Sequence, residues 1–103
     1  MHQHIEWDEP GSASVAEYFK HDPDHMPPYP GAIISARYQG RIVRVKVEAY
    51  REDDAVSIGS VAAILDIHGH HHETHFKLSL GDIVRLPDDK RAMEHWKEDE
   101  KER

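Results

Sequence analysis

Hydrophobic and polar residues alternate most regularly in the middle of the chain. Two stretches rich in β-branched and aromatic residues, 32–38 and 41–50, flank the dipeptide Gln39-Gly40. A two-residue turn at this dipeptide places apolar side chains opposite one another on a single face. The turn and both alternating patterns therefore predict a β-hairpin with one buried face. The predicted pairs are Tyr38–Arg41, Ala36–Val43, Ile34–Val45 and Ala32–Val47.

A second hairpin is predicted downstream of the charged turn 51–54. Strand character resumes at residue 55 or 56 and runs to about His68, and a break at Gly59-Ser60 is an open alternative. A tight connection at 69–72 leads into a return strand at 73–80. The alternation predicts an inward-facing set on these two strands. Its members are Leu65, Ile67, Thr74, Phe76, Leu78 and Leu80.

The spacing of the strands indicates the fold class. A short last strand at 83–86 ends at Pro87, which has no backbone N–H to continue a ladder. Five short strands joined by tight turns favour a small five-stranded antiparallel barrel or a bent sheet. The segment Leu80-Gly81-Asp82-Ile83-Val84-Arg85-Leu86 resembles the closing turn and strand of SH3-like barrels of the Tudor and KOW type, and the pattern extends over about 55 residues. This resemblance implies a binding module.

Helical and irregular segments are predicted on both sides of the strands. Ser14 and Glu17 match a capping box, which predicts a short helix. Asp88 or Asp89 is expected to cap a second helix at the C-terminal end. The chain is therefore expected to be a mainly β, α+β protein with a single domain, 1–103. The expected parts are an arm at 1–13, a helix at 14–21, a Pro-rich connector at 22–31, the β core at 32–87 and a helix at 88–103.

The composition excludes several classes of protein. With 20 acidic and 13 basic residues the formal charge is −7, which argues against binding nucleic acids or anionic membranes over the whole surface. The absence of cysteine excludes disulfides and thiolate metal sites, and fits a reducing compartment. No apolar run approaches the roughly 18 residues that span a bilayer, and the polar N-terminus does not resemble a secretory signal. We therefore expect a cytoplasmic protein with no membrane contact.

The segment from His68 to His75 holds five of the ten histidines. A two-residue loop pairs His68 with His75, and a four-residue loop pairs His68 with Glu73. In either register the outward face carries Asp66, His68, Glu73 and His75, and opposite Cβ atoms lie about 4.5–5.5 Å apart. Zinc and nickel accept such nitrogen and oxygen ligands, so this face is a candidate divalent-metal site. The alternatives are a polar turn that binds metals adventitiously, and a pH-sensitive tip, because imidazoles titrate near pH 6.5.

The outward face of the first hairpin is a second candidate site. It carries Arg37, Arg44 and Lys46. Residues 32–51 contain five basic side chains and one acidic side chain, a local charge of +4. Such a face suits a phosphate or an acidic partner, and small β-barrels bind nucleic acids on faces of this kind. The alternative is a solvated face, or one covered by the acidic arm or by the C-terminal helix.

Aromatic residues outside the strands are candidates for contact with a partner. Trp7 lies in the arm and Tyr29 in the connector. Aromatic anchors on such segments suit docking or self-association, and packing against the barrel is an equal alternative for Trp7. No Gly-x-Ser-x-Gly elbow occurs. The best catalytic case is a metal-activated water in the histidine hairpin.

The sequence therefore favours a non-enzymatic, acidic binding module that acts through protein–protein contact, as an inhibitor or an adaptor. The first alternative is an accessory protein that binds a divalent metal through the hairpin His68–His75. The second is a nucleic-acid binder that uses the basic face of the hairpin at 32–50. A homo-oligomer is compatible with each of these functions.

Overall fold

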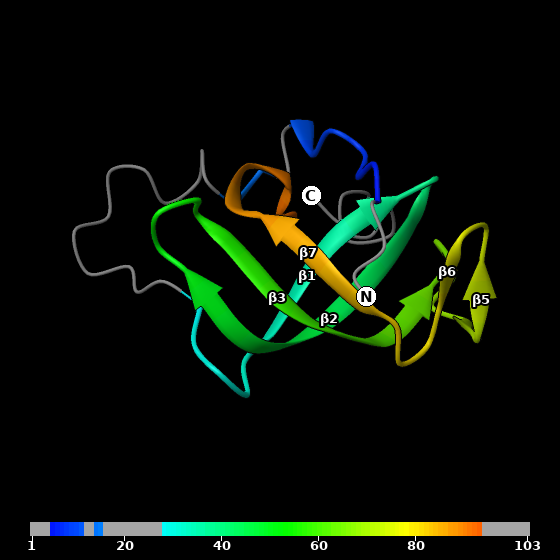
Figure 1. The fold of residues 1–103 in the computed structure, drawn as a ribbon. Helices are drawn as coiled ribbons and strands as arrows, with labels where there is room; N and C mark the ends of the chain where they lie inside the picture. The colour runs from blue at the N-terminus through cyan, green and yellow to red at the C-terminus, as the bar shows by residue number, and fades with distance from the viewer. Residues whose placement is uncertain (1–4, 12–13, 16–27, 94–103) are drawn as a thin grey trace.

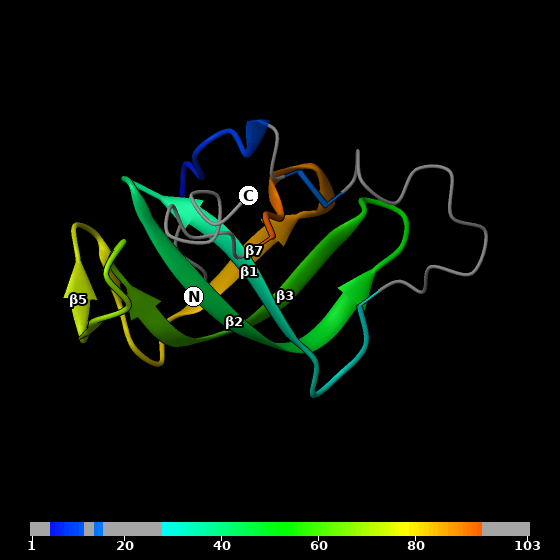
Figure 2. The same cartoon turned by 180° about the vertical axis from the view of Figure 1, so that it is seen from behind.

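The computed structural model describes residues 5–11, 14–15 and 28–93. The chain folds into an antiparallel sheet that curls into a half-barrel (Figure 1), and the view from behind shows the same curl (Figure 2). The fold is therefore mainly β. The strands are β1 (Ile33–Tyr38), β2 (Arg41–Arg51), β3 (Val56–Leu65), β4 (His71–His72), β5 (Thr74–His75), β6 (Leu78–Ser79) and β7 (Ile83–Pro87), and the short 3-10 helix η2 (Asp88–Lys90) follows them.

The β1–β2 hairpin confirms the predicted register. Ile34 pairs with Val45, and Ala36 pairs with Val43. Gln39 and Gly40 both have positive φ values, 49° and 81°, as a two-residue turn with right-handed strand twist requires. The carboxylate of Asp8 accepts hydrogen bonds from the backbone N–H groups of both turn residues, at 3.0 and 2.9 Å. The arm therefore stabilises the turn from outside the hairpin.

The third strand begins where it was predicted to begin and ends three residues earlier than predicted. β3 continues through Gly59 without a break, so the alternative of an interruption there is wrong. It ends at Leu65 instead of His68, because the next residue, Asp66, begins a loop. β7 pairs with the first half of β3, and β4 pairs with its end, so β3 is shared between two neighbours. Register shifts between β2 and β3 accompany the bend of the sheet.

The concave face of the sheet holds the core. The core cluster takes apolar side chains from β1, β2, β3, β6 and β7, and several of them have no exposed surface. The cluster also contains Ile5 and Trp7, so the predicted arm contributes two side chains to the core. The sheet members of this cluster are Ile34, Ala36, Tyr38, Val43, Val45, Val47, Val61, Ile64, Leu78, Val84 and Leu86.

Trp7 connects the two edges of the half-barrel. Its indole N–H donates to the carbonyl of Arg85 on β7, at 2.9 Å. The next residue, Asp8, donates its backbone N–H to the carbonyl of Arg37 on β1, at 2.8 Å. Trp7 is 6% exposed and its ring meets that of Tyr38 edge-on, with centroids 6.1 Å apart. The arm therefore lies between β1 and β7 and fills the opening between them.

The predicted C-terminal helix is not observed in the residues that the structure describes. Asp88–Lys90 form η2, and Arg91 and Ala92 then extend beside β1. The backbone N–H of Ala92 donates to the carbonyl of Ser35, at 2.9 Å, and this bond competes with continuation of a helix. The predicted C-terminal helix beyond Met93, the predicted helix at 14–21 beyond Val15, and most of the connector at 22–31 lie outside the described residues.

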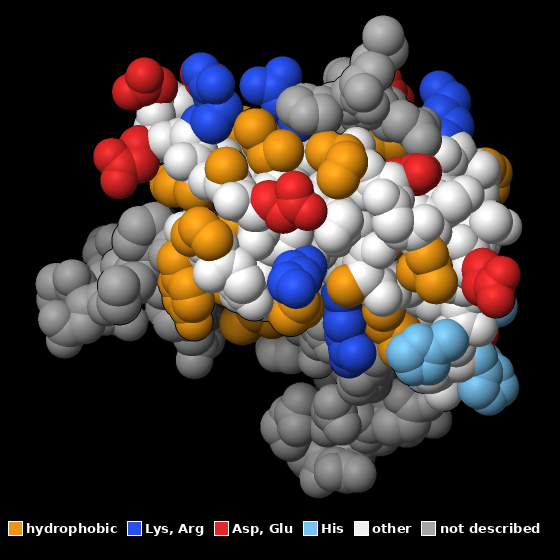
Figure 3. Space-filling model, turned by 60° about the horizontal axis from the view of Figure 1, so that its bottom comes forward, with side chains coloured by type: hydrophobic (Ala, Val, Ile, Leu, Met, Phe, Trp, Pro, Cys, Tyr) orange, Lys and Arg blue, Asp and Glu red, His pale blue; other side chains and the backbone are white. Residues whose placement is uncertain are grey.

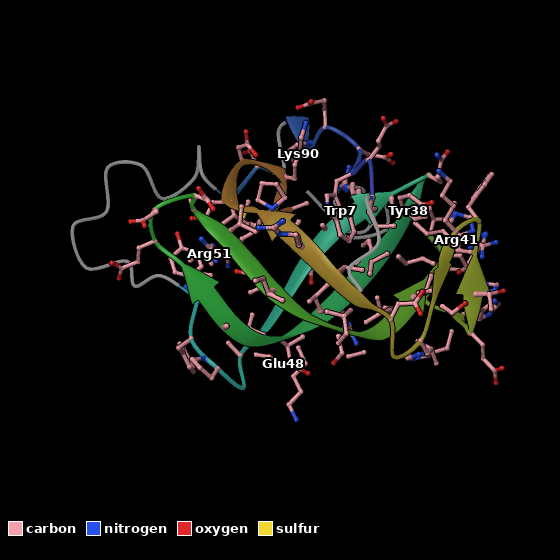
Figure 4. The ribbon with its side chains drawn as sticks, in the orientation of Figure 1. Trp7, Tyr38, Arg41, Glu48, Arg51 and Lys90 are labelled. Atoms are coloured by element: carbon pink, nitrogen blue, oxygen red, sulfur yellow. The ribbon has the colours of Figure 1, made fainter. Side chains whose placement is uncertain are left out.

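Side chains hold η2 in place from two directions. The hydroxyl of Tyr50 on β2 donates to Asp88, at 2.6 Å. Burial and this hydrogen bond raise the pKa of Tyr50 to about 12. Lys90 forms an ion pair with Glu9 of the arm (Lys90 is labelled in Figure 4). The arm and η2 are therefore linked to each other as well as to the sheet.

Gly59 marks the closest approach of two strands. A Cβ atom added at this glycine would lie 2.1 Å from the carbonyl oxygen of Lys46 and 2.9 Å from a methyl group of Val45. The first contact is with backbone, which cannot rotate away. The bend of β2 against β3 therefore requires a residue without a side chain at this position.

We expect Gly59→Ala to lower the free energy of unfolding by about 3 kcal/mol or more, because the strands must separate to admit the methyl group. Ser60→Ala at the neighbouring position is the control, and its expected change is within about 0.5 kcal/mol. Urea denaturation of both variants measures the difference. A Gly59→Ala protein as stable as the control would contradict the close approach of the strands.

Candidate functional site

The five histidines between positions 68 and 75 lie in an excursion of the chain between β3 and β7, which we call the apical segment (residues 66–82). β4 returns along the end of β3, and β5 and β6 form a separate small hairpin. Figure 1 shows β5 and β6 at one end of the sheet, opposite the β2–β3 turn. The apical segment therefore forms one end of the half-barrel.

Asp66 organises the loop that carries the first histidines. Its Oδ1 atom accepts hydrogen bonds from the backbone N–H groups of His68, at 2.9 Å, and His70, at 3.0 Å. Its Oδ2 atom lies 2.9 Å from Nε2 of His72 and 3.8 Å from Nδ1 of His70. The hydrogen bond with His72, followed by those from the two amides, holds the pKa of Asp66 well below its usual range. The carboxylate therefore stays ionised, with both oxygens engaged.

The pairing of this loop differs from both predicted registers. Leu65 pairs with His71 and Ile64 pairs with His72, so the residues from Asp66 to His70 form the connection. Both predictions continued the ladder through Asp66 and His68. The Asp66 side chain ends the ladder instead, because it accepts the backbone N–H groups that a facing strand would otherwise bond.

The structure separates the four residues of the predicted metal site. His68 and Glu73 are exposed, and Asp66 contacts the backbone of His68. His75 lies on the other side of the apical segment, with Nε2 3.0 Å from the carbonyl oxygen of Gln39 in the β1–β2 turn. Within residues 5–11, 14–15 and 28–93, no group of three or more His, Asp or Glu side chains is arranged to hold a metal ion.

A chain of aromatic rings connects the core to the β5–β6 hairpin. The ring of Tyr38 lies between Trp7 on one side and the apical segment on the other (Figure 4). Its centroid is 5.9 Å from the imidazole of His75, and the ring of Phe76 is 4.7 Å from that imidazole. The backbone N–H of Lys77 donates to the Tyr38 hydroxyl, at 3.3 Å. The hairpin therefore has a fixed position on the core.

Phe76 is the functional candidate that the sequence pattern missed. It occupies the turn between β5 and β6 with φ of 56°, and 73% of its surface is exposed. Of the inward-facing set predicted for the return strand, Leu78 is fully buried, whereas Phe76 and Leu80 are exposed. That prediction assumed one continuous strand at 73–80. The turn at residues 76–77 interrupts the alternation and directs Phe76 outward.

The basic residues of the first hairpin lie on its outward face, as the confirmed register requires. Arg37 pairs with Ile42, Arg44 with Ser35, and Lys46 with Ile33. Arg37 and Arg44 are half-buried, and Lys46 is exposed. On the face shown in Figure 3, single basic, acidic and hydrophobic side chains are interspersed, and histidines gather at one edge.

The two predicted aromatic anchors have different environments. Trp7 is 6% exposed and belongs to the core, so packing explains its position. Tyr29 is 60% exposed at the end of the connector, where its carbonyl accepts the backbone N–H of Ala32 at 3.0 Å. Of this pair, only Tyr29 presents its ring at the surface.

Comparison with known proteins found no matching family, no similar curated protein and no similar solved structure. Among the described residues, no helix has the length and apolar character needed to cross a membrane.

We expect acid to destabilise the protein partly through Asp66. Because the pKa of Asp66 is lower in the folded chain, its carboxylate contributes stability fully above its unfolded pKa of about 4, and this contribution is lost as the pH falls toward the folded value. Asp66→Asn keeps an oxygen acceptor for the two amides but removes the charge. Its free energy of unfolding should fall less steeply than that of the wild type below about pH 4.

Denaturation at several pH values between about 2 and 6 measures these slopes. The control is Asp53→Asn, which removes an exposed carboxylate from the β2–β3 turn. Identical slopes for the wild type and Asp66→Asn would show that Asp66 is not held in its ionised form by the loop.

Proposed function

We propose that the chain is a small SH3-like β-barrel that acts as a non-enzymatic binding module, with Phe76 as its main contact to a protein partner. The connectivity of the chain supports the SH3-like assignment. β1, β2, β3 and β7 pair in succession, and a 3-10 turn follows β7. Arg91 then pairs with Ala36 on β1 and brings the segment after β7 back to the first strand. SH3-like barrels commonly serve as binding modules, which is an argument by analogy.

The conformation of Phe76 carries the proposal. A residue with a Cβ atom in the left-handed region is strained by about 1–2 kcal/mol. Phe76 accepts this strain and still exposes most of a large apolar side chain, which contributes little to the core. Strained residues that folding does not require cluster at functional sites. Exposed aromatic side chains on rigid elements are the usual anchors of protein–protein contacts.

The surroundings of Phe76 suit an anchor. His75 and Tyr38 contact the ring edge-on, so its position is fixed before a partner arrives. Ile67 and Leu80, elsewhere in the apical segment, are 52% and 45% exposed and add apolar surface to this end of the molecule. An inhibitor or adaptor in the cytoplasm, without membrane contact, is the role that fits this module.

The alternatives have weaker support. Nucleic-acid binding through Arg37, Arg44 and Lys46 would use a face on which Glu48 is also exposed, on a protein with a formal charge of −7. Self-association through Phe76 remains an outcome of the binding experiment. Metal binding by the histidine loop would be compatible with the proposed module, but the four residues that the sequence predicted do not form one group of ligands.

We expect Phe76→Gly to separate function from stability. Glycine relieves the left-handed strain, and the lost ring contacts are worth about 0.5–1.5 kcal/mol, so the free energy of unfolding should change by less than about 1 kcal/mol. Affinity for the partner should fall about 30-fold or more, as for loss of an anchor worth about 2 kcal/mol. Affinity purification with wild-type and variant baits, followed by titration of the recovered protein, measures the binding.

The control is Ile33→Gly, which removes another exposed apolar side chain, 53% exposed, from β1. It should retain the partner at wild-type affinity, and so should the wild type in the presence of a chelator. If Phe76→Gly binds as tightly as this control, Phe76 is not the contact. The only partner recovered could be a second copy of the same chain. Analytical sedimentation of the wild type and of Phe76→Gly would then show a homo-oligomer, and the proposed role as an adaptor would be wrong.

A further inference from the structure

We propose that Asp66, His70 and His72 form a binding site for one divalent transition-metal ion, for which zinc is the natural probe. The three side chains belong to one short stretch of the apical segment. Two imidazole nitrogens approach the same carboxylate oxygen, Oδ2 of Asp66. This set differs from the one that the sequence predicted, because it exchanges His68, Glu73 and His75 for His70 and His72. It does not depend on the proposed role of Phe76.

The distances are close to those that a metal ion requires. Zinc binds nitrogen and oxygen ligands at about 2.1 Å, so two ligands of a tetrahedral ion lie about 3.4 Å apart. Nε2 of His72 is 2.9 Å and Nδ1 of His70 is 3.8 Å from Oδ2 of Asp66. The first distance must open and the second must close, each by about half an ångström.

The carboxylate of Asp66 is already oriented to bind an ion together with the imidazoles. Oδ1 of Asp66 is occupied by the two backbone N–H groups, so the second oxygen is directed toward the imidazoles. Hydrogen bonds of this kind to the non-coordinating atom of a ligand fix its orientation and strengthen metal sites. Asp66 and His72 are also the more enclosed partners, with side chains 21% and 32% exposed.

The side chain of His70 has to move closer to Asp66 for the three groups to bind one ion. In the structure the three side chains are not at coordination distances. The His70 side chain is 78% exposed, so it can rotate toward the ion with little resistance from packing. The ion would replace the proton shared between His72 and Asp66. Binding therefore involves a change of rotamer at His70 and a small separation of His72 from Asp66.

Two other histidines of this segment, His71 and His75, are less well placed to bind the same ion. His75 is held by the carbonyl of Gln39 on the far side of Tyr38. His71 pairs with Leu65, whose side chain faces away from that of Ile64, the partner of His72. His71 is therefore the matched control, because it has the same residue type, a neighbouring position and an exposed side chain.

The test is titration calorimetry of zinc chloride into the full chain, with four variants. Asp66→Asn, His70→Ala and His72→Ala each remove one proposed ligand, and His71→Ala removes the control histidine. We expect the wild type and His71→Ala to bind one ion with the same affinity, and the three ligand variants to bind at least tenfold more weakly. Far-ultraviolet circular dichroism and urea denaturation verify that each variant is folded.

A second readout separates this site from adventitious binding elsewhere in a chain with ten histidines. Zinc should raise the thermal unfolding temperature of the wild type and of His71→Ala, and should raise that of Asp66→Asn much less. Equal losses of affinity in His71→Ala and His72→Ala would show diffuse histidine binding and overturn the proposal. Retention of wild-type affinity by Asp66→Asn would overturn it as well.

Discussion

The interaction on which the structure most depends is that of Trp7 with the two edges of the curled sheet. The five-stranded sheet does not close on itself: among the described residues β1 and β7 do not pair with each other, and an apolar concave face lies between them. Trp7 lies on that face, donates to the carbonyl of Arg85 on β7 and packs against Tyr38 of β1. One large side chain therefore covers the core and connects strands that do not pair with each other, and burial of a tryptophan this size contributes several kcal/mol.

The same interaction determines how the apical segment is displayed. Tyr38 is fixed by Trp7 on one side and receives the backbone N–H of Lys77 on the other, so the β5–β6 hairpin has a defined position relative to the core. The strained and exposed Phe76 is therefore presented on a rigid support. Asp66 plays a corresponding part in the histidine loop, where its two oxygens orient the backbone and the imidazole of His72. Both candidate sites are organised by interactions made before any ligand binds.

The first hairpin could be predicted in detail from the sequence, whereas the apical segment could not. Gln39-Gly40 selects a two-residue turn, and the apolar alternation on both sides fixes one register, so local signals suffice there. In the apical segment the alternation of Phe76, Leu78 and Leu80 suggested one strand. The bonds that His75 and Lys77 make to the carbonyl of Gln39 and to the hydroxyl of Tyr38 select two short strands and a turn instead. The same holds for Ala92, whose bond to Ser35 replaces a helix. These contacts join residues more than 30 positions apart, which periodicity cannot detect.

The most direct test of this account is the free energy of unfolding of Trp7→Ala, measured by urea denaturation beside Glu6→Ala, which truncates the exposed neighbour in the arm. If Trp7 closes the half-barrel, its truncation should lower the free energy of unfolding by about 3–5 kcal/mol, a large share of the about 5–15 kcal/mol of a typical domain. Glu6→Ala should change it by less than about 0.5 kcal/mol. A loss below about 1 kcal/mol for Trp7→Ala would mean that the sheet holds its curl without the arm, and would contradict the account.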